Sequence, residues 1–269
     1  MQQAIADMRD RGQYVTALWA SQAAIYQRYG FAQTTVNVAY QINPQDIQFV
    51  SPTPPQGLCR RYSLEDGYPI IRQLYIDFIS HRHLYLHRSK TLWGNNALAE
   101  NNADGPVYIA VYHDADDAPQ GYVVYTTRSG KVQHAARGQE LVIRDMAWLT
   151  SDACLGLWTF IAKHDLVGRV RYATAPPDDP TPMLLQEPRL LHPQWQEGIW
   201  LRLTDVQNAL ATRGYDAPGR LVIEVDGDDL ADWNNGVFEV ETDGDSAQSK
   251  AVASAPDVRL GIRALAALY

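Results

Sequence analysis

Cysteine is scarce in this sequence, and so are long apolar runs. The two cysteines, Cys59 and Cys154, are too few for a disulfide framework and lack the spacing of a zinc site. No stretch approaches the roughly 20 apolar residues that a membrane-spanning helix needs. Met1 opens a polar helical pattern rather than the basic and then apolar pattern of a signal peptide. We therefore expect a reduced, cytoplasmic location.

Positive charge is also in short supply. The chain has 23 Lys and Arg against 31 Asp and Glu, which gives a net charge of -8. Nucleic acids and anionic membranes are bound by clustered Lys and Arg, so neither is an expected partner. Cationic or neutral partners fit better. The length of 269 residues, 46% of them hydrophobic, predicts two or more domains.

Several catalytic and metal-binding motifs are missing. The sequence has no G-x-S-x-G elbow, H-E-x-x-H helix or phosphate loop, which excludes the commonest hydrolases and NTPases. His83 and His87 are spaced to share a helical face, but no acidic partner is near, so a solvated helix is favoured over a metal site. The acidic runs 114–117 and 226–229 lack the ligand spacing of a calcium loop and are predicted to be hairpin turns. We expect no metal.

Hydrophobic periodicity predicts an α+β protein with three parts. The first part, 1–48, contains a helix, a strand, a second helix with Ser21 as its N-cap, and a strand, at 1–11, 14–20, 21–30 and 31–42. The Pro-rich stretch 51–57 is the clearest linker. The second part, 49–195, has helices at 63–79 and 151–163 and strands at 107–113, 121–128, 140–148 and 169–173. The third, 196–269, has strands at 199–203, 220–225 and 236–241 and helices at 205–212 and 260–268.

Three segments carry a resemblance to a known family. Val15-Thr-Ala-Leu-Trp-Ala-Ser-Gln-Ala-Ala-Ile-Tyr-Gln-Arg-Tyr-Gly-Phe31 is similar to the strand and helix that follow the acetyl-CoA loop of GNAT N-acetyltransferases, and is closest to the Eis (enhanced intracellular survival) family. Residues 198–215 and 256–269 resemble the sterol-carrier-like domain of that family. The resemblance covers essentially the whole chain. It implies the end of one GNAT fold (1–48), a GNAT-like domain without a cofactor loop (49–195) and an incomplete sterol-carrier-like domain (196–269).

The resemblance also implies an activity and its residues. It implies an N-acetyltransferase that uses acetyl-CoA as co-substrate and acts on primary amines, either small-molecule amines such as aminoglycosides or peptide lysines. Tyr26 stands where the family has its catalytic acid, and Ser21 and Gln22 stand where it contacts the cofactor. A phenol, with a pKa of about 10, is protonated at neutral pH and can donate to a departing thiolate. The family further implies a homo-oligomer, with a hexamer as one form.

Alternatives stand beside each of these inferences. Without the resemblance, a tyrosine on a short helix is ordinarily packed against the core. The loop that cradles the pyrophosphate should precede Met1, and the C-terminal carboxylate that serves the family as a base should follow Tyr269, so we expect these residues alone to be inactive. The junction 143–156 lacks the phosphate-binding motif and has Asp152 at a helix start, where it would repel a pyrophosphate. The rival function is a binding module that encloses a hydrophobic ligand near 221–225.

Overall fold

The computed structural model describes residues 1–82, 84–100, 105–134 and 136–269 and contains two compact units. One unit combines the two ends of the chain, Met1–Val36 and Glu197–Tyr269, and the other is the continuous segment Asn37–Gln196. Both units mix helices with open sheets, which confirms the predicted α+β class. The three-domain division at 48 and 195 stays a prediction.

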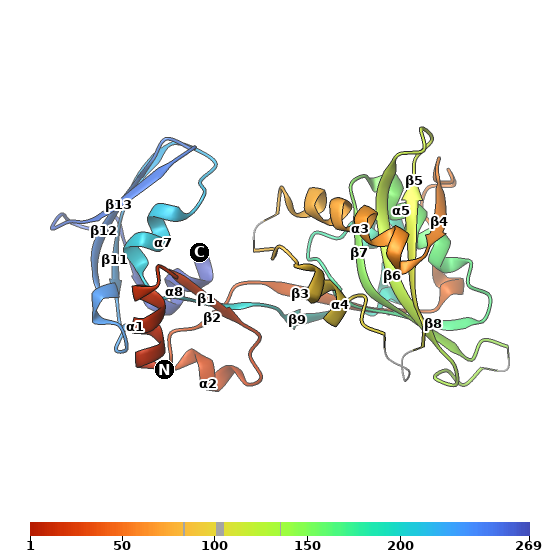
Figure 1. Cartoon of the computed structure of the whole chain (residues 1–269), viewed down its shortest axis with the longest axis horizontal. Helices are drawn as coiled ribbons and strands as arrows, with labels where there is room; N and C mark the ends of the chain where they lie inside the picture. The colour runs from red at the N-terminus through yellow and green to blue at the C-terminus, as the bar shows by residue number, and fades with distance from the viewer. Residues whose placement is uncertain (83, 101–104, 135) are drawn as a thin grey trace. The chain divides into compact units, whose positions relative to one another are not determined.

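The central unit is built on a seven-stranded sheet (Figure 1). In spatial order its strands are β4 (Leu58–Tyr62), β5 (Val107–His113), β6 (Pro119–Arg128), β7 (Gln139–Trp148), β8 (Val167–Ala175), β3 (Val36–Ile42) and β9 (Gln194–Glu197). β7 and β8 run parallel, whereas the pairs β4–β5, β5–β6, β6–β7 and β3–β8 are antiparallel. The helices of this unit are α3 (Leu64–Ile79), α4 (Lys90–Asn95), α5 (Ser151–Ala162) and α6 (Thr181–Leu184), with short 3-10 turns at Pro44–Asp46 and Pro188–Leu191.

Helices α3 and α5 cover opposite faces of this sheet. A Cβ built on Gly67 of α3 would lie 2.9 Å from the Ile109 side chain, and one built on Gly156 of α5 would lie 2.2 Å from the Tyr112 ring. Ile109 and Tyr112 are three residues apart on β5 and therefore point to opposite faces. With both faces covered, β5 is buried almost throughout and β6 is buried over residues 121–126, which explains the apolar runs in these two strands.

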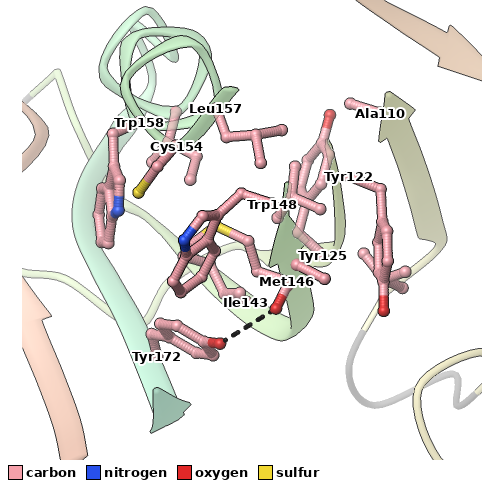
Figure 2. Packing of buried hydrophobic residues seen from close by; sticks show 14 of the residues in the cluster. Ala110, Tyr122, Tyr125, Ile143, Met146, Trp148, Cys154, Leu157, Trp158 and Tyr172 are labelled. Carbon is pink, nitrogen blue, oxygen red and sulfur yellow. Dashed lines mark hydrogen bonds between the residues drawn. The ribbon is translucent and has the colours of Figure 1, made fainter. Parts of the chain in front are cut away.

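The core between β7, β8 and α5 is rich in aromatic side chains (Figure 2). Trp158 and Tyr122 are fully buried, and Trp148 is 6% exposed. The Tyr172 hydroxyl donates to the backbone carbonyl of Met146 at 3.5 Å. Large rings that bury most of their surface contribute strongly to the hydrophobic stabilisation of such a core.

The other unit contains two smaller sheets. The three-stranded sheet has the order β1 (Val15–Leu18), β10 (Trp200–Leu203) and β2 (Ala32–Gln33), and the four-stranded sheet has the order β13 (Ala247–Ala251), β12 (Gly236–Thr242), β11 (Gly219–Asp226) and β14 (Val258–Gly261). Its helices are α1 (Gln2–Asp10), α2 (Ala23–Gln27), α7 (Val206–Thr212) and α8 (Ile262–Leu268), with a 3-10 turn at Asp232–Asn234. Side chains of α7, α8, β11 and β12 form one shared core.

None of the helices within the described ranges combines the length and the hydropathy needed to cross a lipid bilayer.

Candidate active site

The candidate site lies where β1 leads into α2. β1 pairs antiparallel with β10, with Val15 opposite Leu203 and Leu18 opposite Trp200. After the turn, Gln22 takes the N-cap position in an extended conformation, and α2 begins at Ala23. The prediction that Ser21 caps this helix was therefore wrong by one residue. Ser21 and Gln22 are both exposed, and the Gln22 side chain makes no capping hydrogen bond.

Tyr26 lies on the last turn of α2 and is half-buried. Its ring packs edge-on against Phe31, with the ring centroids 5.9 Å apart, and Phe31 is only 2% exposed. Within the described residues the phenol hydroxyl has no hydrogen-bond partner. The packing thus holds the ring while the hydroxyl is left to interact with other groups.

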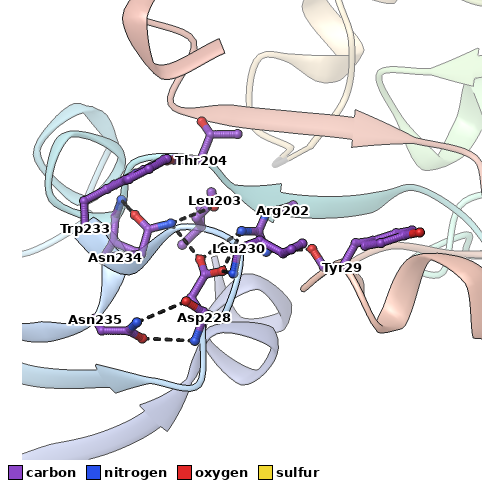
Figure 3. Close-up of polar contacts among 10 residues, drawn as sticks. Tyr29, Arg202, Leu203, Thr204, Asp228, Leu230, Trp233, Asn234 and Asn235 are labelled. Atoms are coloured by element: carbon purple, nitrogen blue, oxygen red, sulfur yellow. Dashed lines mark hydrogen bonds and ion pairs between the residues drawn. The ribbon is translucent and has the colours of Figure 1, made fainter. Parts of the chain in front are cut away.

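A buried arginine contacts the turn that follows the same helix (Figure 3). Nη1 of Arg202 donates to the backbone carbonyl of Tyr29 at 2.6 Å. Nη2 of Arg202 lies 2.8 and 2.9 Å from the two carboxylate oxygens of Asp228, and both side chains are 1% exposed. Gly30 has a φ of +81°, and a Cβ at this position would lie 1.8 Å from the Arg202 Nη1. Only glycine fits both the left-handed backbone and the guanidinium.

The sequence prediction missed this arrangement. Arg202 occurs in a short apolar strand, Trp200-Leu-Arg-Leu203, where a charged residue between apolar neighbours was the only available signal. Asp228 was assigned to a hairpin turn, and it does lie in the connection between β11 and β12, but its carboxylate is buried in an ion pair.

The junction of β7 and α5 in the central unit differs from the β1–α2 junction in the side chains at the start of its helix. Thr150 is the N-cap, and its hydroxyl accepts a hydrogen bond from the Ala153 N–H at 3.1 Å. The Asp152 carboxylate in the first turn accepts a hydrogen bond from the Tyr112 hydroxyl. Burial, together with this bond, raises the pKa of Tyr112 to about 12. A carboxylate therefore stands beside the helix N-terminus, as the sequence predicted.

A cavity of about 520 Å³ lies beside this junction. It is lined from the end of α3 by residues 77, 78 and 80–82 and from the β7–α5 junction by residues 148–151. Arg82 contributes the positive charge, but its Nη2 lies 3.0 Å from the Asp178 carboxylate and its Nη1 donates to the Phe78 carbonyl.

The structure gives different outcomes for the predicted histidine pair and for the first acidic run, 114–117. His83 lies outside the described residues, and residues 84–89, which include His87, are not helical. Asp114 caps the β5–β6 hairpin turn by accepting from the Asp116 and Ala118 N–H groups, which confirms a turn. Among the described residues no group of three His, Cys, Asp or Glu is arranged to hold a metal ion. Cys59 and Cys154 are free thiols.

Two family models match the chain. The model described as an acetyltransferase (GNAT) domain matches residues 84–203, and the model described as a sterol carrier protein domain matches residues 206–269. The first match ends one residue beyond Arg202, and the second contains Asp228.

Curated relatives and solved structures agree with these models. An uncharacterized N-acetyltransferase of Streptomyces coelicolor is 27% identical over 100% of this chain and 65% of its own length. The N-acetyltransferase Eis of Mycobacterium tuberculosis is 28% identical over 77% of this chain and 50% of its own length. The crystal structure of a GCN5-related N-acetyltransferase from Anabaena variabilis superposes with a TM-score of 0.84 at 25% identity, covering 100% of this chain and 66% of that one. The chain thus spans slightly less than two thirds of the length of the Streptomyces relative.

Proposed function

Because the chain belongs to the Eis-like family of GNAT N-acetyltransferases, we propose that the protein is an enzyme that transfers the acetyl group of acetyl-CoA to primary amines. The observation that carries this proposal is the match of residues 84–203 to an acetyltransferase domain. In addition, the strand-to-helix turn before α2 is followed by a half-buried tyrosine, Tyr26. Acetyl-CoA is the co-substrate that this family of folds uses, and no step needs a metal.

Tyr26 is the proposed catalytic acid. The neutral amine attacks the thioester carbonyl, the new C–N bond forms as the C–S bond breaks, and the departing thiolate takes the proton of the Tyr26 hydroxyl. The proton lost by the amine returns to the tyrosinate through solvent. The free hydroxyl and the fixed ring of Tyr26 support this role.

Ser21 and Gln22 are the proposed contacts to the amide-rich arm of the cofactor. Both are exposed at the start of α2, on the N-terminal side of Tyr26. The Ser21 hydroxyl can donate and accept, and the Gln22 amide can do both, which suits the alternating carbonyl and N–H groups of that arm.

The proposed acceptors are cationic amines, either aminoglycoside-like small molecules or lysine side chains. A net charge of -8 raises the local concentration of polycations through long-range attraction. We also propose that the protein forms a homo-oligomer, with a hexamer as one form, and that it is located in the cytoplasm. No finding favours the alternative of a hydrophobic-ligand binding module, and side chains such as Ile223, Phe238 and Leu265 pack together inside the sterol-carrier-like segment.

The direct test is an acetylation assay on the protein made from the complete reading frame. Tyr26→Phe keeps the ring contact with Phe31 and removes the proton donor, so we expect kcat to fall by about 10²- to 10⁴-fold. Ser21→Ala is expected to raise KM for acetyl-CoA with a smaller effect on kcat. Tyr108→Phe, at a half-buried tyrosine of the central unit, is the matched control. An unchanged kcat in Tyr26→Phe would remove Tyr26 from this role.

A further inference from the structure

We propose that Arg202 is a positioning residue that couples the sterol-carrier-like segment to the helix carrying Tyr26. Asp228 orients the Arg202 guanidinium, and the guanidinium in turn fixes the position of the Tyr29 carbonyl just after α2. This inference rests on the proposed role of Tyr26 and assigns the sterol-carrier-like segment a task in the reaction.

The carboxylate of Asp228 is held by its own loop before it meets Arg202. Its Oδ2 accepts from the Asn234 side-chain amide at 2.8 Å, and its Oδ1 accepts from the Leu230 N–H at 3.3 Å. The Asp228 backbone is fixed by the Asn235 side chain, which accepts from its N–H at 3.0 Å and donates to its carbonyl at 3.1 Å (Figure 3). A carboxylate held from this many directions presents the guanidinium with a fixed anchor.

Helix α2 depends on such an anchor because it is very short. It has five residues, and isolated helices below about 12 residues are marginal in water. The chain leaves α2 through a turn at residues 28–30, and the guanidinium of Arg202 holds this turn at the Tyr29 carbonyl.

The anchored turn is hydrogen-bonded directly to Tyr26. The Tyr26 carbonyl accepts from the Tyr29 N–H at 2.9 Å and from the Phe31 N–H at 3.3 Å. Moving the Tyr29 carbonyl therefore moves the turn that carries the phenol. A displacement of about 1 Å in a catalytic group can lower a rate by about 10²-fold.

A second contact joins the same two segments, but it cannot replace the first. Nη2 of Arg263 on α8 donates to Oε1 of Gln27 at 3.0 Å, and both groups lie at the surface, where water competes for them. Arg202 by contrast is fully buried, so water does not compete for its bond to the Tyr29 carbonyl.

The first experiment measures hydrogen exchange of the 269-residue chain and needs no activity. Arg202→Lys keeps the charge opposite Asp228 but has one nitrogen where arginine uses two, so the bond to Tyr29 is lost. We expect the amides of Tyr29, Gly30 and Phe31 to exchange about 10- to 100-fold faster, the change that matches one hydrogen bond to a charged group. Amides in β11 and β12 should be unchanged.

Two further variants separate positioning from folding. In Arg202→Met/Asp228→Leu the ion pair is replaced by apolar side chains, which buried pairs often tolerate, while the bond to Tyr29 is absent. Arg220→Lys is the matched control, because the Arg220 Nε lies 2.8 Å from Glu239 on the neighbouring strand. If both Arg202 variants leave the amides of residues 29–31 as protected as in Arg220→Lys, the proposal is overturned.

The second experiment measures kinetics of the protein made from the complete reading frame. We expect Arg202→Lys to lower kcat about 10- to 100-fold with KM for the amine unchanged, because the acid is displaced while the amine site is not. Faster exchange at residues 29–31 with an unchanged kcat would overturn the positioning role. If Tyr26→Phe itself keeps full activity while exchange still responds to Arg202→Lys, the proposed function of Tyr26 fails and the structural coupling stands.

Discussion

Burial of a single carboxyl group predicts how the stability of the central unit changes with pH. Asp179 is 8% exposed, and burial raises its pKa even though hydrogen bonds from Thr181 and Tyr40 favour the ionised form. Because the folded state holds the proton more tightly than the unfolded state, this group costs stability as pH rises through the unfolded and then the folded pKa.

We therefore expect Asp179→Asn to gain stability relative to the parent chain as pH rises from 4 to 8, because the variant carries no carboxyl group whose ionisation opposes burial. Urea unfolding at both pH values measures the difference, with Asp116→Asn in an exposed turn as the control. A constant difference between variant and parent across this range would contradict the assignment.

The residues of the candidate site differ in how far the sequence alone could identify them. Tyr26, Ser21 and Gln22 lie in one continuous segment, so a local resemblance was enough to single them out. Arg202 and Asp228 come together only through the fold, from positions 26 residues apart, and nothing local distinguishes Asp228 from the aspartates around it. Contacts of this kind need the three-dimensional structure.

At the scale of an element, helix α5 sets two physical effects against each other at Gly156. Helix propensity favours Ala over Gly by about 1 kcal/mol, but a Cβ at Gly156 would lie 2.2 Å from the buried Tyr112 ring. Packing should win, since overpacking a filled core costs about 1 to 3 kcal/mol or more. We expect Gly156→Ala to lower the free energy of unfolding by about 2 kcal/mol.

Gly94→Ala in α4 is the matched control for this prediction. A Cβ there has no atom within 4 Å among the described residues, so propensity acts alone and the variant should be more stable by up to about 1 kcal/mol. Denaturant unfolding of both variants provides the comparison. The same sign of change at the two positions would show that packing against Tyr112 does not control this helix.

Elements with a strong periodic pattern were predicted well, and those defined by pairing were not. The helix at 63–79 and the strands at 107–113, 121–128 and 140–148 were confirmed within a few residues. The edge strands β4, β9 and β13 were missed, because they are short and largely exposed and so carry no apolar run. The strand predicted at 31–42 is two strands, β2 and β3, which pair in different sheets. A change of sheet leaves no trace in residue periodicity.

At the scale of the whole molecule, the α+β class followed from the alternation of helical and strand patterns, whereas the composition of the units did not. The compact central unit begins at Asn37 and so includes the Pro-rich stretch 51–57, while the domain boundary that this stretch predicts stays a prediction. Residues from the two ends of the chain share one core, with Tyr14 and Val15 packed against Leu203 and the sterol-carrier-like side chains. Such long-range packing cannot be deduced from the local sequence pattern.

Two separate cores predict two unfolding transitions. Leu157 is 0% exposed in the core of the central unit, and Leu210 is 4% exposed in the core of the other unit. Removing buried leucine methyl groups typically costs about 2 to 5 kcal/mol. By differential scanning calorimetry, Leu157→Ala should lower the midpoint of one transition and Leu210→Ala the midpoint of the other. Two results would contradict this prediction: equal shifts of both midpoints in each variant, or a single transition in every sample. Either result would mean that the two units unfold as one cooperative body.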